Sequence, residues 1–438
     1  MDVFSGHKAI RKAVFETRLF DTHEHLPQEE ERLAAGVDVL ATLFPHYASS
    51  DLVSAGMSEQ DLNLIRDVRL PLEERLEKFA LYWKAIQNTG YARAVNIAIR
   101  DLYGLDEITR GTCSELEKRM KKANRKGLYR WVLKEKSGVE ISILDSLEGR
   151  LDVDRDFFAP VRRFDDFIFV KDRGEVEALA RRVGVAIHSL ADLVKALEVE
   201  FTRLSGTIVG VKLALAYRRI IHFEKTTFAE AEDVFNKIYA QCVFKRVFTD
   251  GLRVNLPEAL SFEEAKPLQD FMVHRVIQLA IEHRLPIQIH TGLQEGNENI
   301  ITNSNPTHLT NLLMEYREAK FDIFHGGYPY TGELTALAKN FPNVYVDMCW
   351  LHIISPHVAR SALSEWLDTV PGNKILGFGG DYRFVEGVYG HSVLAREGIG
   401  RVLVDKVEND GMSESEATYL AKRILRDNGR ELFFPEKP

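Results

Sequence analysis

The stretch Asp21-Thr22-His23-Glu24-His25 follows the apolar pair Leu19-Phe20 near the start of the chain. In an extended strand, residues two apart face the same side, so His23 and His25 are expected to point together at the end of a first strand. Two imidazoles on one face suit a divalent metal such as Zn, Fe or Mn. The alternative is a pair of hydrogen-bonded core histidines.

Three later segments repeat this arrangement, in which a metal-binding residue type follows a short apolar run. They are Gln288-Ile289-His290-Thr291-Gly292, Phe324-His325-Gly326-Gly327-Tyr328-Pro329 and Gly377-Phe378-Gly379-Gly380-Asp381. The expected ligands are therefore His23, His25, His290 and Asp381. A capping or turn role is the alternative for His290 and Asp381. For His325, direct ligation and a supporting or proton-shuttling role are both open.

The wider pattern alternates short apolar runs with helical periodicity. The expected strands are Arg18–Asp21, Val139–Leu144, Phe167–Val170, Thr207–Leu215, Pro286–Ile289, Phe321–Phe324, Val344–Met348 and Lys374–Phe378. The expected helices between them are Glu175–Glu200, Phe228–Phe248, Ser261–His283, Thr307–Lys320, Gly332–Asn340 and Ser361–Val370. This alternation predicts an α/β fold, a (β/α)8 TIM barrel, as one domain over residues 1–438.

Two regions depart from the alternation. Residues 28–136 are helical in pattern and too long for a simple connection, so we expect a helical insertion after strand one that caps the barrel mouth. The tail from Ser392 to Phe434 is also helical, with Ser413-Glu414-Ser415-Glu416 as a helix start, and is expected as a C-terminal extension along the outside.

Composition limits the partners and the compartment. The net charge of -8 is spread along the chain, so nucleic acid is not an expected partner. Cys113, Cys242 and Cys349 are widely spaced, which fits a reducing compartment. No long apolar segment is present, so we expect a cytoplasmic protein with no membrane partner. A small-molecule substrate and a homo-oligomer are the expected partners.

Several further residues are candidates for substrate binding. Lys212, at the end of Thr207-Ile208-Val209-Gly210-Val211, has three open interpretations. It could be carbamylated and bridge two metals, pair with a substrate anion, or neutralise a nearby carboxylate. Tyr217 and Trp350 are candidates to line the pocket, although an aromatic residue at a strand end is more often part of the core.

These residues resemble the amidohydrolase superfamily of metal-dependent barrel enzymes, through Asp21-x-His23-x-His25 with His290, His325 and Asp381. Gly326-Gly327-Tyr328-Pro329, Pro342-Asn343-Val344-Tyr345-Val346-Asp347 and Gly377-Phe378-Gly379-Gly380-Asp381 resemble its amidohydrolase-2 branch, and Lys212 to Arg218 is similar to the strand-four segment of nodulin-like amidohydrolases. The resemblance implies a divalent metal cofactor, with Zn first and Mn or Fe as alternatives.

A second resemblance is to the uronate isomerases. Phe79–Ile108, His46-Tyr47, Asp381-Tyr382-Arg383 and Asn428-Gly429-Arg430-Glu431-Leu432-Phe433 carry it. It implies that Arg383 holds a sugar acid and that His46 lies near the substrate. The chain departs from that family where Ala48-Ser49-Ser50-Asp51 replaces a substrate-holding Trp-Arg pair.

The expected activity is metal-dependent hydrolysis of an amide, ester or lactone in a small substrate that bears a carboxylate. One metal ion would lower the pKa of a bound water from 15.7 toward about 7. Asp381 would move the proton, His325 would stabilise the oxyanion or relay the proton, and Arg218 or Arg383 would clamp the carboxylate. A sugar-acid isomerase or decarboxylase and a non-enzymatic binding module are the alternatives.

Overall fold

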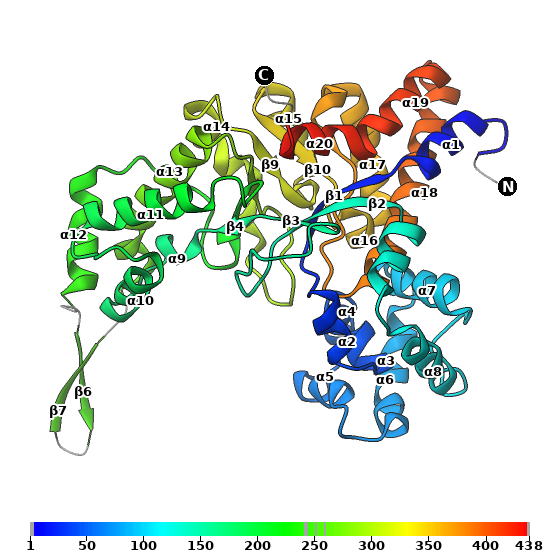
Figure 1. Ribbon diagram of the computed structural model, residues 1–438, viewed down its shortest axis with the longest axis horizontal. Helices are drawn as coiled ribbons and strands as arrows, with labels where there is room; N and C mark the ends of the chain where they lie inside the picture. Colours follow the sequence, from blue (N-terminus) through cyan, green and yellow to red (C-terminus); the bar gives the residue numbers. More distant parts are fainter. Residues whose placement is uncertain (1–3, 241–243, 250–251, 258–259, 436–438) are drawn as a thin grey trace.

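Two parallel sheets together supply eight strand positions. Figure 1 shows β1, β2, β3, β9 and β10 in the central part of the molecule. The computed structural model describes residues 4–240, 244–249, 252–257 and 260–435. The strands in ring order are β1 (Leu19–Glu24), β2 (Val139–Leu144), β3 (Phe158–Pro160) with β4 (Arg162–Arg163), β5 (Val211–Leu213), β8 (Ile287–Ile289), β9 (Phe321–Ile323), β10 (Val344–Asp347) and β11 (Ile375–Leu376). Every neighbouring pair in this order is parallel.

Backbone hydrogen bonds join the two sheets into a ring. β3 and β4 form one continuous third strand, because Val161 N donates to Leu144 O on one side and Arg162 N donates to Gly210 O on the other. Thr22 N donates to Phe378 O at 3.0 Å and connects the eighth position back to the first. All six residues of β1 are buried, as expected for a strand with side chains inside the ring on one face and helices on the other. The predicted α/β barrel is therefore confirmed.

One predicted strand is wrong. Phe167–Val170 belongs to the short helix α9 (Asp165–Ile168) and the residues after it, and the third strand lies earlier, at Phe158–Arg163. Phe167 and Ile168 are apolar because they form the buried side of that helix. A short apolar run has the same appearance in both kinds of structure, which is the physical reason for the error.

The outer helices lie close to their expected positions, with two corrections. They are α10 (Arg173–Val183), α11 (Leu190–Leu204), α12 (Phe228–Tyr239), α13 (Phe262–Glu282), α14 (Thr310–Glu315), α15 (Thr331–Asn340), α16 (Leu351–Ile354), α17 (Pro356–Thr369) and α18 (Val385–Asn409). The expected helix Glu175–Glu200 is two helices, because Gly184 ends α10 with a left-handed backbone and Ser189 caps α11. The expected helix Phe228–Phe248 ends at Tyr239, and β6 (Phe244–Thr249) pairs with β7 (Leu252–Pro257) instead. Cys242 lies outside the described residues.

The region after β1 is helical throughout, and Figure 1 shows it as a lobe below the strands. Its helices are α2 (Glu29–Ala34), α3 (Val39–Leu43), α4 (Ala48–Ser54), α5 (Glu59–Arg66), α6 (Leu72–Ile86), α7 (Gly90–Tyr103), α8 (Cys113–Ala123) and the π-helix η1 (Arg130–Lys136). That this helical insertion caps the barrel mouth remains a prediction.

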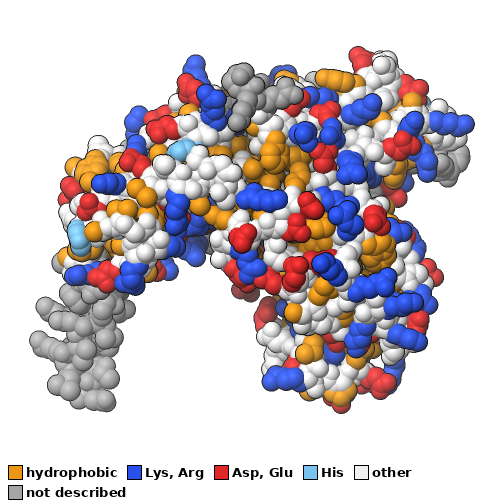
Figure 2. All heavy atoms as spheres, in the orientation of Figure 1, with side chains coloured by type: hydrophobic (Ala, Val, Ile, Leu, Met, Phe, Trp, Pro, Cys, Tyr) orange, Lys and Arg blue, Asp and Glu red, His pale blue; other side chains and the backbone are white. Residues whose placement is uncertain are grey.

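The chain ends pack together on the outside of the barrel. The tail continues from α18 through α19 (Glu414–Lys422), η7 (Arg423–Asp427) and α20 (Asn428–Phe433), and α1 (Lys8–Glu16) lies against α18 and α19. The predicted start at Ser413 is a capping box with Glu416. Acidic and basic side chains are interspersed over the face in Figure 2. In the described parts of the chain, no helix has the length and apolar character needed to cross a bilayer.

Candidate metal centre

His23 lies in β1 and His25 directly after it, and each has one ring nitrogen already engaged. His23 Nδ1 lies 3.2 Å from Gln288 Oε1, and His25 Nδ1 lies 2.7 Å from the Asp145 backbone oxygen. Because oxygens of amide groups only accept hydrogen bonds, both Nδ1 atoms carry the proton. The lone pairs are therefore on the two Nε2 atoms. These lie 3.7 Å and 3.1 Å from Asp381 Oδ1.

His290 and His325 face each other on the neighbouring strands. His290 Nε2 lies 2.9 Å from the Leu293 backbone oxygen, and His325 Nδ1 lies 3.1 Å from that of Cys349. By the same reasoning, the lone pairs are on His290 Nδ1 and His325 Nε2, and these two atoms are 3.1 Å apart. His325 Nε2 is also 3.9 Å from Asp381 Oδ2. The structure thus brings His290 to His325 rather than into the group formed by His23 and His25.

Asp381 lies between the two histidine pairs in a constrained backbone conformation. Its φ is +59°, and His325 and Trp350 at the two preceding strand ends have φ of +62° and +63°. Left-handed conformations of non-glycine residues are costly and concentrate at functional sites. Two buried carboxylates hold the turn: Gly380 N donates to Asp21 Oδ1 at 3.0 Å, and Tyr382 N donates to Glu24 Oε2 at 2.7 Å.

The protonation states of these groups favour a cation among them. Burial holds the pKa of His23 and His290 well below the usual value and lowers that of His325 to about 4, so all three are neutral at pH 7. Burial alone would raise the pKa of Asp381, but the neighbouring imidazoles of His25, His23 and His325 hold it well below its usual range. Neutral imidazoles and a carboxylate are the donor set of Zn and related divalent ions.

The arrangement passes a simple test of fit for a metal. Imidazole nitrogens of His23, His25 and His325 surround an ionised carboxylate, and at the 3.1 Å contact between His290 Nδ1 and His325 Nε2 an acceptor atom faces another acceptor. Acceptors repel one another unless a positive charge lies between them. Within the described residues, His23, His25 and Asp145, and also His325, Cys349 and Asp381, form groups of potential ligands with atoms within 4.8 Å of one another.

Lys212 lies beneath this centre on β5, in an unusual environment for an amine. Its side chain is buried, its Nζ has no hydrogen-bond partner among the described residues, and it lies 3.5 Å from the centroid of the Phe324 ring. Burial lowers the pKa of this amine to about 8. A lysine with a partly neutral amine is compatible with carbamylation and with anion binding, and the charges of Asp145 and Asp381 act on it, so all three of its sequence interpretations stay open.

Asp145 and Arg163 are among the site residues that the sequence reasoning missed. Asp145 follows β2, and its carboxylate binds Arg163 of β4 through Arg163 Nε at 2.9 Å and 2.7 Å. Asp145 Oδ2 is 3.6 Å from His23 Nε2. Asp145 could have been recognised, because it directly follows the correctly predicted strand Val139–Leu144. Arg163 could not, because the third strand was predicted at Phe167–Val170, after this residue.

These groups surround a cavity of about 190 Å³. It is lined by His23, His25, His46, Tyr47, Leu147, Arg163, Lys212, Tyr217, His290, Glu295, Asp381 and Arg383. Of the six candidate substrate-binding residues, four lie here: His46, Lys212, Tyr217 and Arg383. The cavity is smaller than the roughly 300–1,000 Å³ of typical ligand pockets, which indicates a small substrate.

The other two candidates lie outside this cavity. Arg218 places its guanidinium 4.9 Å from the centroid of the Phe169 ring, away from the metal-type centre. Trp350 is buried and stacks on Tyr47 with ring centroids 4.5 Å apart, so it supports the cavity wall from behind. Each of these side chains, which the sequence interpretation assigned to substrate binding, instead contacts an aromatic ring of the protein.

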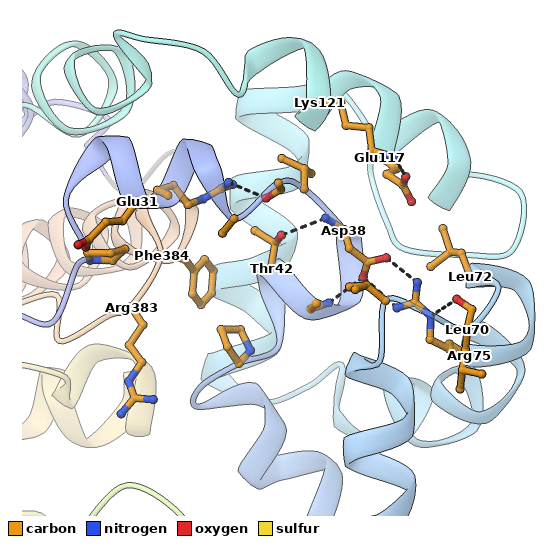
Figure 3. Close-up of a pocket in the computed structure, with 18 of the residues that line it drawn as sticks. Glu31, Asp38, Thr42, Leu70, Leu72, Arg75, Glu117, Lys121, Arg383 and Phe384 are labelled. Carbon is orange, nitrogen blue, oxygen red and sulfur yellow. Dashed lines mark hydrogen bonds and ion pairs between the residues drawn. The ribbon is translucent and has the colours of Figure 1, made fainter. Parts of the chain in front are cut away.

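Arg383 also borders two outer cavities. One, of about 260 Å³, continues from His25 and Leu147 to Glu31 and Arg150. The other, of about 930 Å³, extends among the insertion helices. Figure 3 shows Arg383 at one end of this large pocket, on the side of Glu31 and Phe384, while Asp38 and Arg75 bind each other farther along it. Arg383 therefore stands where the inner and outer cavities meet.

The fold and site define a class of barrel proteins that carry histidine and aspartate side chains at the carboxyl ends of their strands. Residues 245–405 match the amidohydrolase family model. Protein fluG of Emericella nidulans is 30% identical over 232 residues, which are 52% of this chain and 25% of that protein. The chain therefore spans about a quarter of the length of this curated relative.

Two solved structures share the fold over nearly the whole length. A uronate isomerase from Thermotoga maritima has a TM-score of 0.78 at 18% identity and covers 98% of both chains. A proposed metal-dependent hydrolase from Lactobacillus casei has a TM-score of 0.62 at 18% identity, again over 98% of both. The resemblance to the amidohydrolases seen in the sequence is thus confirmed over residues 245–405, and the solved structures show that the fold is shared over nearly the whole chain.

Proposed function

We propose that this protein is a metal-dependent hydrolase that cleaves an amide, ester or lactone bond in a small substrate bearing a carboxylate. The observation that carries the proposal is the convergence of three imidazole nitrogens, those of His23, His25 and His325, on the Asp381 carboxylate, with His290 against His325. The family model that matches the chain, that of the amidohydrolases, supports the reaction class.

The donor set identifies which residues would hold metal. His23 and His25 with Asp381 Oδ1 form one position, and His290 and His325 with Asp381 Oδ2 offer a second. Imidazole and carboxylate donors favour Zn, with Mn or Fe as alternatives. A bound divalent ion would supply a nucleophile at neutral pH by lowering the pKa of water to about 7, and would polarise the substrate carbonyl.

The residues of the chain perform the remaining steps. Asp381 is ionised at neutral pH, so its carboxylate accepts the proton of the attacking water and delivers it to the leaving group. His325 holds its proton on Nδ1 through the Cys349 carbonyl, which keeps Nε2 directed at Asp381. Arg383 at the cavity mouth binds the substrate carboxylate through its planar guanidinium.

The helical insertion contributes to the same cavity. His46 and Tyr47 from the start of α4 line it, and Tyr47 Oη donates to the Asp381 backbone oxygen at 2.7 Å. We propose that residues 28–136 cap the barrel mouth and so limit the size of the substrate. The same insertion closes off the site from bulk water, which strengthens electrostatic interactions inside it.

Elemental analysis and a mass-balance screen test the proposal. Protein purified with and without added Zn or Mn should contain stoichiometric ion, and a library of N-acyl amino acids, lactones and uronates should yield products heavier by the mass of one water. Absence of bound ion under all conditions would refute the metal centre. Product with unchanged mass would favour isomerisation.

A sugar-acid isomerase is the second candidate, and a specific observation favours it. The uronate isomerase of Thermotoga maritima matches the whole chain, including the insertion, and Asp381-Tyr382-Arg383 fits its expected motif. Against it, Ala48-Ser49-Ser50-Asp51 begins α4 where that family places a Trp-Arg pair. Turnover of a uronate without uptake of water would decide for this candidate.

A further inference from the structure

Two side chains of opposite charge stand at the mouth of the central cavity without a visible protein partner. Glu295, on the loop after β8, is half-buried, and Arg383, two residues after Asp381, is exposed. For neither side chain does the described structure show a hydrogen bond or a direct ion pair; burial raises the pKa of Glu295, and the more distant charges of Arg383 and Arg66 lower it. A half-buried carboxylate without a partner is costly, so a ligand that supplies a donor would be bound favourably.

Three hydrogen bonds hold the loop that carries Glu295 in place. Glu295 N donates to Tyr217 Oη at 3.1 Å, and Gln294 Nε2 donates to the Ala216 backbone oxygen at 2.7 Å. Asn297 Nδ2 donates to the Ser50 backbone oxygen of α4 at 3.2 Å, which ties the loop to the insertion. These bonds use only the backbone of Glu295, so its carboxylate is preorganised and left free for the cavity.

The other charged residues of the cavity do not compete for the same role. Arg163 is bound by Asp145, and Asp381 belongs to the proposed metal centre. Lys212 lies deeper, against the Phe324 ring. The mouth therefore offers one anion and one cation that make no direct contact with each other, while the reactive centre lies at the inner end.

We propose that this mouth recognises the zwitterionic head of an α-amino acid, with its ammonium group at Glu295 and its carboxylate at Arg383, while the bond to be cleaved extends inward to Asp381. The proposal rests on the proposed hydrolytic function and specifies its substrate class. A cavity of about 190 Å³ suits a molecule of this size. Glu295 is then the residue that separates free amino acids from compounds that carry only a carboxylate.

Binding measurements on the metal-loaded full chain test this without requiring turnover. The probes are L-asparagine and L-glutamine, their counterparts without the ammonium group (succinamate and glutaramate), and the counterparts without the carboxylate (3-aminopropanamide and 4-aminobutanamide). Calorimetry should show the amino acids binding on the order of tenfold to a hundredfold more tightly than either kind of counterpart, the range expected for a charge-assisted hydrogen bond.

Variants separate the two charges. Glu295→Gln should abolish the preference for the ammonium group while leaving the affinity for succinamate unchanged, and Arg383→Gln should weaken every probe with a carboxylate. Glu298→Gln is the matched control, because Glu298 lies on the same loop, is exposed and does not line the cavity. Thermal melting verifies that each variant is folded.

Three outcomes would overturn the proposal: equal affinity for amino acids and their counterparts, no binding of any amino acid at millimolar concentration, or an unchanged preference in Glu295→Gln. If the first or third occurs while the screen still detects hydrolysis, the hydrolytic function stands and only the substrate class fails. If no metal is bound and no probe is hydrolysed, it is the proposed function that fails.

Discussion

The substitution Gln288→Leu tests whether the barrel interior orients a metal ligand. Gln288 on β8 is fully buried, and its Oε1 accepts the proton of His23 Nδ1. Its Nε2 donates to the Thr22 backbone oxygen at 2.9 Å and to Asp322 Oδ2 at 3.1 Å. This single amide therefore determines which nitrogen of His23 faces Asp381.

The expected cost follows from the groups that leucine would leave without a partner. Three buried polar groups, on Thr22, His23 and Asp322, would each lose a hydrogen bond, at about 1–3 kcal/mol apiece. Leucine fills most of the volume, so little cavity cost is added. The sum is about 3–6 kcal/mol after partial relaxation, and for 438 residues this lowers Tm by roughly 3–7 °C, taking an unfolding entropy of about 2.1 cal/mol/K per residue. Metal affinity should fall about 10–100-fold, as for other residues that orient a metal ligand.

The assays are thermal unfolding and metal titration against a chelating dye. Gln278→Leu is the control, because Gln278 on α13 binds Arg275 and Tyr316 away from the site. It should lower Tm without changing metal affinity. If Gln288→Leu also lowered Tm but left metal affinity intact, His23 would not be a ligand and the argument from ring tautomers would be wrong.

Three further predictions concern the same site. Asp381→Asn should retain metal through the histidines but lower kcat by about 10²–10⁴, measured by steady-state kinetics, because the proton acceptor is lost; unchanged kcat would exclude that role. Burial lowers the pKa of Lys212 to about 8, so its amine is charged below pH 8 and neutral above. KM for an anionic substrate should therefore rise as pH increases through 8. If a Lys212→Met variant kept this rise in KM, the rise would belong to another group. Gly380→Ala should destabilise the fold by about 1–3 kcal/mol in chemical denaturation, because its Cβ would lie 1.7 Å from Glu24 Oε1, whereas Gly332→Ala, whose Cβ would meet no atom within 4 Å, should cost nothing.

Most of the fold was predictable from local pattern. Val139–Leu144 is a strand with the expected bounds, and seven of the eight expected runs lie on strands of the ring. The exception, Phe167–Val170, was wrong because burial of a short helix and burial of a strand demand the same apolar residues. Capping boxes such as Ser413 with Glu416 were readable because their hydrogen bonds span only three residues.

The site was predictable in part. His23 in β1, His25 directly after it and Asp381 on the loop after β11 meet at one end of the ring as expected. Arg218 and Trp350 could not be judged, since their contacts with Phe169 and Tyr47 join segments distant in the chain. Glu295 could not be recognised either, because its loop is held by Tyr217 and by the insertion.

The sequence by itself determined the order of strands and helices, the helical insertion and the residue types available at the strand ends, because these depend on periodicity and on contacts between near neighbours. Only the tertiary structure decided that His290 faces His325, that Asp145 binds Arg163, and that Glu295 and Arg383 share the cavity mouth. Such pairings depend on strand register and on loop geometry across the ring, where a shift of one residue reverses the direction of every side chain.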